Sequence, residues 1–186
     1  MVKPNITQKA KKMSDVVSAF SNGSHKFFVK YSEIPDNPLT YSGWEFTAVN
    51  TRDFSSTEDA ISLEELKSKK EDFYIYPIGA YIHGGVALHF GYIGQRFDEC
   101  SAGYIYSKKS MWQSEENAEE DAKSNIEAFE AYINGQCFDV TEEDEEGEIV
   151  DIRDFYSEEA AFNFIKEHSK RLELTELEEN VTVSWE

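Results

Sequence analysis

The chain has 186 residues, 40% of them hydrophobic, with 13 Phe, 10 Tyr and 3 Trp. This bulk suffices for a hydrophobic core and excludes a wholly disordered chain, and no apolar run is long enough to cross a bilayer. The formal net charge of −19 opposes binding to nucleic acid and membrane surfaces and favours basic protein partners.

The negative charge is concentrated in the C-terminal part of the sequence. Residues 1–113 hold 13 acidic and 13 basic side chains, whereas residues 114–186 hold 24 acidic and 5 basic ones, a net charge of −19. One interpretation is the solvated acidic surface of an ordinary soluble protein. The other is a surface that binds a basic partner, because net charge governs solubility and association rather than fold.

The N-terminal region is predicted to contain a leader, a short helix and two strands. Residues 1–14 hold four Lys and no acid, which indicates a flexible basic leader ahead of a single domain over residues 15–186. Ser14-Asp15 is expected to cap a helix through Phe20. Alternating patterns then predict strands, and a Glu/Lys-rich pattern predicts a short helix. These elements are the strands at 25–33 and 43–50 and the helix ending at Lys70.

The stretch from Phe73 to Tyr106 is the predicted centre of the fold, because it is rich in aromatic residues and holds no Lys. Three strands are expected here, at 73–83, 86–93 and 101–109. Pro77 lies inside the first strand and favours an edge position or a bulge, since proline cannot donate a hydrogen bond to its neighbour. Gly84-Gly85 is typical of a hairpin turn.

The acidic part is predicted to form two helices and a hairpin. Ser114 caps a helix over 115–133, and Ser157 caps a second helix. Helical spacing predicts that the apolar side chains of each helix face a core; these are Ala118, Ala122, Ile126, Phe129 and Ile133, then Ala161, Phe164, Ile165 and Leu172. A hairpin turns at Glu145-Glu146-Gly147, and residues 180–186 alternate like a strand. The class is therefore α+β, an antiparallel sheet with two helices of the C-terminal half packed on it.

An ordered series of residues between Tyr81 and Tyr156 marks a strand, a glycine turn, a helix and an acidic hairpin. The series is His83, Gly85, Asp98, Gly103, Ile105, Tyr106, Phe129, Tyr132, Gly135 and Asp154-Phe155-Tyr156. It resembles a family of small proteins of phages and mobile elements. That family's pattern is His-x-Gly, then Cys-Pro-Trp-Asp-Ser-Gly-Gln-x-Gly-x-Ile-Tyr, then Tyr-x-x-Tyr-x-x-Gly. The resemblance implies a viral or mobile-element origin and a cytoplasmic site of action.

The chain departs from the family pattern at the residues that would carry chemistry. Phe97 stands in the place of Trp, Gln95 and Arg96 in the place of Cys-Pro, and Glu99 in the place of Ser. Any thiol or serine chemistry of that motif would therefore be absent from this member.

His83 and Asp98 are the candidate catalytic pair, because a hairpin can bring their segments together and a carboxylate-held His serves as a general base or a metal ligand. No adjacent nucleophile completes a dyad. The alternative is a structural His whose ring nitrogens bond the turn at Gly84-Gly85.

No cofactor or metal is predicted from the remaining motifs. Cys100 and Cys137 form no C-x-x-C pair, which favours buried, reduced thiols in a cytosolic protein. An EF-hand placed with Gly147 at its sixth position would put Arg153 at the bidentate position, where a cation defeats calcium binding. The sequence contains no phosphate-binding loop, dinucleotide fingerprint or zinc-protease motif.

Carboxylates clustered on the C-terminal helices and hairpin are the remaining candidate site. The predicted partner-binding residues are Glu115, Glu116, Glu119, Glu120, Asp121, Glu127, Glu130, Glu142, Glu143, Asp144, Glu145 and Glu146. A helix rises about 1.5 Å per residue and duplex DNA carries a charge about every 1.7 Å of its axis, so such a row can present a comparable line of charge.

The sequence therefore favours a DNA-mimicking inhibitor from a phage or mobile element. The protein would then be of the anti-CRISPR or antirestriction type, and its partner is expected to be a basic host protein or ribonucleoprotein complex. The protein itself is expected to bind neither nucleic acid nor a membrane. The alternatives are a small hydrolase-like enzyme that uses His83 and Asp98, and an accessory phage protein. The oligomeric state is left open.

Overall fold

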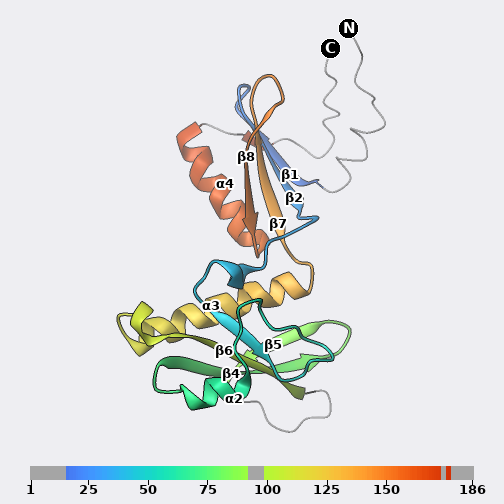
Figure 1. Cartoon of the computed structure of the whole chain (residues 1–186). Helices are drawn as coiled ribbons and strands as arrows, with labels where there is room; N and C mark the ends of the chain where they lie inside the picture. Colours follow the sequence, from blue (N-terminus) through green and yellow to red (C-terminus); the bar gives the residue numbers. More distant parts are fainter. Residues whose placement is uncertain (1–15, 92–98, 173–174, 177–186) are drawn as a thin grey trace. The chain divides into compact units, whose positions relative to one another are not determined.

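The computed structural model describes residues 16–91, 99–172 and 175–176, and its contacts divide the chain into two compact units (Figure 1). One unit spans residues 36–135, and the other joins residues 1–35 to residues 136–186. The predicted leader, Asp98 and the predicted strand at 180–186 lie outside the described residues. The sequence pattern did not indicate this division, because the second unit combines segments that lie more than a hundred residues apart in the chain.

The unit formed by residues 36–135 contains a four-stranded antiparallel sheet and the helix α3. The strand order is β3-β6-β4-β5. The elements are η1 (Pro38–Thr40), β3 (Glu45–Ala48), α2 (Leu63–Ser68), β4 (Phe73–Ile82), β5 (Val86–Phe90), β6 (Glu99–Lys108), η2 (Lys109–Met111) and α3 (Glu115–Ile133). The three strands predicted between Phe73 and Tyr106 are thus adjacent, with β4 in the middle.

The β4–β5 hairpin turns at the two predicted glycines. Gly84 has a φ of 71°, which a residue without a Cβ adopts at little cost, and the His83 N–H donates to the Gly85 carbonyl at 3.0 Å. The register between β4 and β6 shifts between Ile78 and Gly79, and β5 pairs with β4 only from Gly79 onward. A bulge therefore lies one residue beyond Pro77, in keeping with the expectation that a proline in a strand marks an edge or a bulge.

Helix α3 lies on this sheet through the residues that the helical spacing predicted. The Ser114 hydroxyl accepts a hydrogen bond from the Asn117 N–H at 3.2 Å and caps the helix. Ile126 and Phe129 are buried against the sheet, and the Phe129 ring lies 5.4 Å from that of Phe46. A Cβ at Gly103 would collide with the backbone of Thr47, which explains why a glycine stands in β6 beside β3.

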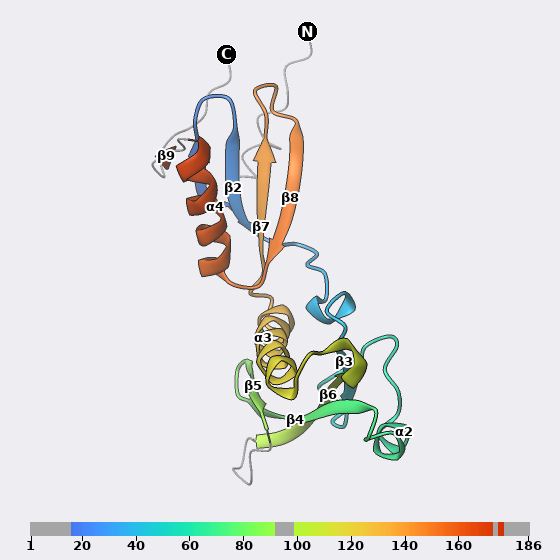
Figure 2. The ribbon, with the colours of Figure 1, turned by 90° about the vertical axis from the view of Figure 1, so that its left-hand side faces the viewer.

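The other unit contains a second antiparallel sheet, in the order β8-β7-β2-β1-β9, and the helix α4 (Figure 2). Its elements are β1 (Val16–Ser21), β2 (Lys26–Tyr31), β7 (Phe138–Glu143), β8 (Ile149–Phe155), α4 (Glu158–Leu172) and β9 (Thr175–Glu176). Phe27, Val29 and Val140 of the sheet pack with Ala161 and Ile165 of α4 to form its core.

The helix predicted to end at Phe20 is wrong, since residues 16–21 form strand β1. Val16 and Val17 are β-branched and favour a strand. The Asn22 side chain accepts hydrogen bonds from the Ser24 and His25 N–H groups and closes a turn that pairs β1 with β2. The tertiary pairing overrides the local capping signal.

The α+β class is confirmed, with the two main helices in the C-terminal half. The helices do not share one sheet: α3 packs against the sheet of residues 36–135, and α4 against the second sheet.

The negative charge is divided between the two units as well. Residues 36–135 hold 18 acidic and 8 basic side chains, a net charge of −10, which leaves −9 for the other unit. No helix among the described residues is long and apolar enough to span a membrane.

Candidate interaction surfaces

The candidate catalytic pair is not assembled by the described residues. His83 is exposed at the β4–β5 turn, and its ring lies 6.2 Å from that of Tyr81. Asp98 lies outside the described residues. Within the described ranges, no three His, Cys, Asp or Glu side chains come together in a way that could hold a metal ion.

The two cysteines lie in different units. Cys137 is buried, and burial raises the pKa of its thiol, with Asp154 and Asp139 adding to the effect. A raised thiol pKa lowers the thiolate fraction, so this residue suits a structural role. Cys100 is half-buried beside the Asn50 side chain, whose amide nitrogen lies 3.5 Å from its sulfur.

Two of the predicted partner-binding carboxylates of α3 point into the unit and support its structure. The Asp121 carboxylate accepts a hydrogen bond from the buried Trp44 Nε1 at 2.8 Å and from Asn125 at 2.9 Å. The Glu130 carboxylate accepts a hydrogen bond from the Leu88 N–H of β5. These carboxylates are used inside the unit, so they contribute less to an outward acidic face than their charge predicts.

A second set of α3 carboxylates points outward. Glu116, Glu120 and Glu127 are exposed. At 100° per residue they fall within about 40° around the helix axis, and they span about 17 Å along it. Lys123 falls in the same stripe and bonds Glu119 at 2.6 Å, so one cation interrupts the row. Glu115 is also exposed, in the first turn of the helix.

The β7–β8 hairpin provides the other acidic group. Glu142 is held by His25, whose Nδ1 lies 2.8 Å from its carboxylate, and Asp144 closes the turn by accepting from the Glu148 N–H at 2.9 Å. Glu143 is half-buried in β7. Glu145 and Glu146 are exposed at the tip, so these two, with Glu148, are the carboxylates of the hairpin that face solvent.

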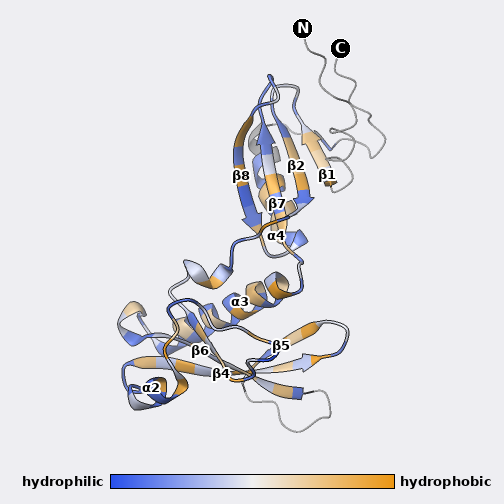
Figure 3. Ribbon diagram, turned by 45° about the vertical axis from the view of Figure 1, so that its right-hand side comes forward, coloured by the Kyte–Doolittle hydropathy of each residue, from blue (hydrophilic) through white to orange (hydrophobic). Residues whose placement is uncertain are grey.

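Sequence reasoning missed the apolar character of the strand that follows this tip. Ile149, Val150 and Ile152 of β8 are 48%, 54% and 55% exposed. Figure 3 shows hydrophobic residues interspersed with hydrophilic ones along this strand. The sequence Ile-Val-Asp-Ile-Arg-Asp-Phe alternates only in part. It holds more apolar residues than one buried face of a strand needs, and this excess could have indicated exposed apolar side chains.

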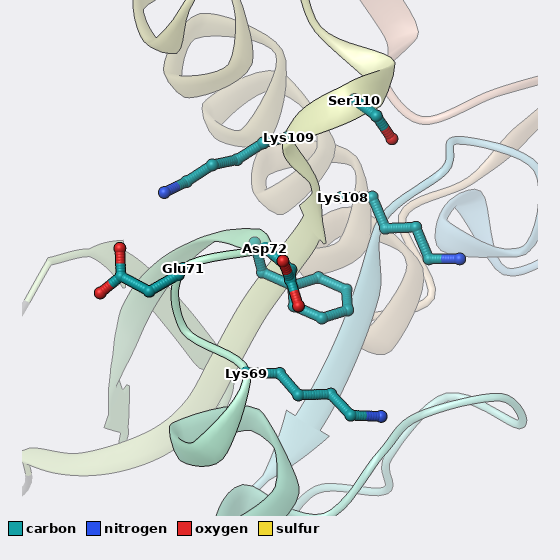
Figure 4. A pocket seen from close by; sticks show the side chains of 7 residues that line it. Lys69, Glu71, Asp72, Lys108, Lys109 and Ser110 are labelled. Carbon is teal, nitrogen blue, oxygen red and sulfur yellow. The ribbon is translucent and has the colours of Figure 1, made fainter.

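An open depression of about 480 Å³ lies between the end of α2 and the end of β6 (Figure 4). It is lined by Lys69, Glu71, Asp72, Phe73, Lys108, Lys109 and Ser110. The ammonium groups of Lys108 and Lys109 point to opposite sides, and Lys69 bonds Glu65 at 2.6 Å. The lysines therefore do not converge on one point, and the depression is not a formed anion site.

Comparison with protein-family models, with curated proteins and with solved structures found no match.

Proposed function

We propose that this protein is an inhibitor that binds a basic, nucleic-acid-handling complex of a host cell in the place of nucleic acid. A CRISPR effector or a restriction enzyme in the host cytoplasm is the class of target that we favour, because both present positively charged grooves. The protein would come from a phage or a mobile element, and the resemblance of residues 81–156 to small proteins of such elements supports this origin.

The observation that carries the proposal is the outward stripe of α3. Glu116, Glu120 and Glu127 project from one side of a helix that is fixed to its sheet by Ile126 and Phe129. A rigid helix presents charges at fixed spacing, which lowers the entropy cost of binding a groove of opposite charge.

The density of charge limits how far the resemblance to nucleic acid extends. Three carboxylates over about 17 Å are sparser than the charge of a duplex, which recurs about every 1.7 Å of its axis. The stripe of α3 therefore replaces a few phosphates rather than a length of duplex. The exposed tip of the other unit, Glu145, Glu146 and Glu148, offers a second set of carboxylates.

The experiment is a binding titration against the host complex captured on the immobilised protein, with three charge-reversal variants. The first changes Glu116, Glu120 and Glu127 to Lys, and the second changes Glu145, Glu146 and Glu148. The control changes Glu58, Glu64 and Glu71, which are exposed elsewhere in the unit of residues 36–135, by the same total charge. Each titration is run at low and high salt.

We expect at least one of the first two variants to slow association more than the control, since charges at the rim of an interface act chiefly on the on-rate. High salt should weaken the wild-type complex, because the Debye length falls from about 10 Å at 0.1 M to about 3 Å at 1 M. DNA should compete for the captured complex. Salt-independent binding that is equal in all three variants would contradict the proposal.

A further inference from the structure

A second open depression, of about 350 Å³, lies in the unit of residues 36–135 between α2 and the side of the sheet that faces away from α3. Its lining is apolar apart from two lysines, and consists of Leu63, Leu66, Lys67, Lys70, Ile75 and Tyr104. This volume is within the range of about 300–1,000 Å³ that is usual for binding pockets. None of the lining side chains is a carboxylate, although the unit has a net charge of −10.

The alternation of side chains along the strands explains this surface. Tyr74 and Tyr76 of β4 pack against the core beneath α3, so Ile75 between them faces the other side of the sheet. In β6, Ile105 is buried in the same core, and its neighbour Tyr104 faces away from α3. Helix α2 has six residues and covers part of this outer face, which leaves Ile75 and Tyr104 half-buried.

The two lysines of the depression have no partner among the described residues. Lys67 lies one helical turn after Leu63, and Lys70 follows in the turn after α2 ends. Both are exposed, and neither ammonium group makes an ion pair or a hydrogen bond with a described residue. The neighbouring Lys69, by contrast, bonds Glu65 at 2.6 Å. The fold therefore leaves uncompensated the two lysines that stand beside apolar side chains.

The acidic side chains of the same segment do not line this depression; they are Glu64, Glu65, Glu71 and Asp72. Glu65 is used by Lys69, and Glu71 and Asp72 line the other depression, beyond the end of α2. Glu64 is exposed and lies about 100° around the helix axis from Leu63. The side of α2 that borders the depression therefore presents positive charge next to an apolar surface.

We propose that this depression is a docking site for an acidic segment of another protein, in which an aliphatic or aromatic side chain stands between carboxylates. The apolar side chain packs against Leu63 and Ile75, and the carboxylates pair with Lys67 and Lys70. Burial of the apolar group supplies affinity, and charge-assisted hydrogen bonds to the lysines supply selectivity. A basic segment is rejected, because it would bring like charges together. This inference goes beyond the proposed function, since it concerns a different surface and a partner of opposite charge.

A second copy of this chain is the competing occupant, because its β7–β8 hairpin combines the exposed Glu146 and Glu148 with the exposed Ile149 and Val150. Such a contact would join two different surfaces, and contacts of that kind generate rings or open filaments. A net charge of −19 on every copy opposes this growth. We therefore favour a segment of another protein, and self-association is the alternative that sedimentation can detect.

The probe is the blocked peptide Glu-Glu-Leu-Phe-Glu-Glu, titrated into the full-length protein at physiological ionic strength. One control peptide carries Lys in place of each Glu, which reverses the charge. A second control carries Ser in place of Leu and Phe, which removes the apolar side chains and keeps the charge. Binding is read from the methyl NMR signals of Leu63, Leu66 and Ile75, which line the depression.

We expect the acidic peptide to shift these methyl signals, and each control peptide to bind at least about tenfold more weakly. Lys67→Glu combined with Lys70→Glu should weaken the acidic peptide by at least about tenfold, since attraction becomes repulsion. The matched control combines Arg52→Glu with Lys108→Glu, which changes the charge of the same unit equally at two exposed residues outside the depression. It should change the affinity by less than about threefold, because distant exposed charges are screened.

Four results would overturn the inference: no binding of the acidic peptide, binding that leaves the three methyl signals unshifted, equal binding of the serine peptide, or equal loss in the two charge-reversal variants. Self-association of the wild type in sedimentation, abolished by the Lys67→Glu and Lys70→Glu variant and retained in the control, would assign the depression to a second copy instead. The proposed function is tested separately, because it concerns the outward carboxylates and the capture of a basic complex.

Discussion

The two sheets of this protein end in edges that are treated in opposite ways. At the edge strand β5, α3 supplies the missing hydrogen bonds: Asn134 accepts from the Val86 N–H at 3.0 Å and donates to its carbonyl at 2.7 Å, and Glu130 accepts from the Leu88 N–H. At the edge strand β8, the described residues provide no such cover, and aliphatic side chains are exposed.

The difference shows that the role of a carboxylate depends on whether it bonds the backbone of a sheet edge or faces solvent. Glu130 and Glu127 lie three residues apart on α3, yet Glu130 closes a sheet edge and Glu127 faces solvent. Net charge counts both alike. A map of candidate contacts must therefore exclude the carboxylates that the fold itself uses, which are chiefly Asp121, Glu130 and Glu142.

The largest effect on stability is expected from the core between α3 and the sheet, which holds α3 against the edge strand β5. Phe129→Ala should lower the free energy of unfolding by about 3–5 kcal/mol, because Phe129 is buried between α3 and the sheet and its loss leaves a cavity. The measurement is urea denaturation followed by circular dichroism and tryptophan fluorescence. A loss well below about 1 kcal/mol would contradict the packing of α3 on this sheet.

The covered edge itself is tested by Asn134→Ala. This change removes the partner of both backbone groups of Val86, and we expect a loss of about 1–3 kcal/mol together with faster hydrogen exchange at the Val86 amide. Glu127→Ala, on the exposed side of the same helix, is the control and should change stability by less than about 0.5 kcal/mol. Similar losses in the two variants would mean that α3 does not close this edge.

Two tyrosines of the sheet, the half-buried Tyr76 and the buried Tyr106, test how hydrogen bonding of a side-chain hydroxyl affects stability. The Tyr76 hydroxyl is buried and has no hydrogen-bond partner among the described residues, whereas the Tyr106 hydroxyl accepts from the Ile61 N–H at 2.7 Å. Near pH 7, Tyr76→Phe should therefore be neutral or slightly stabilising. Tyr106→Phe should cost about 1–3 kcal/mol, because it leaves a donor unsatisfied.

The same pair predicts a dependence on pH. Burial, with Glu115 and Glu119 nearby, raises the pKa of Tyr76 to about 12. The folded state therefore favours the neutral phenol, so this contribution to stability is complete below the unfolded pKa of about 10 and is lost as the pH rises toward 12. Wild type should lose more stability than Tyr76→Phe between these pH values in denaturant melts. Parallel losses would show that Tyr76 ionises as freely as in the unfolded chain.

Much of the fold follows from local patterns in the sequence. The helix over 115–133 was predictable to the residue, because Ser114 caps it and the spacing from Ala118 to Ile133 places its apolar face. The hairpin at Gly84-Gly85 follows from turn chemistry. Strand β1 forms by pairing with β2 across the turn at Asn22, where the capping signal of the sequence misleads. The two separate sheets depend on pairing between distant segments, which no local pattern encodes.

The candidate surfaces were less predictable than the fold. Glu116 and Asp121 are alike in the sequence, and the Trp44 indole that engages Asp121 comes from a loop 77 residues away. The exposed side of β8 depends on its position at a sheet edge, which is a property of strand order and not of residue type.

The smallest effect is expected at His83, in the turn that begins the covered edge strand. Its ring is exposed, and the hydrogen bond to Gly85 uses its backbone N–H, which His83→Ala retains. We therefore expect a stability change below about 0.5 kcal/mol and unchanged capture of the host complex. Gly84→Ala is the matched control in the same turn. It should cost about 1–2 kcal/mol, because φ is 71° there and a Cβ is strained in that region although no atom lies nearby. If His83→Ala abolished the biological activity while circular dichroism showed an intact fold, the turn would be a reactive site, and the acidic surface would no longer suffice to explain the function.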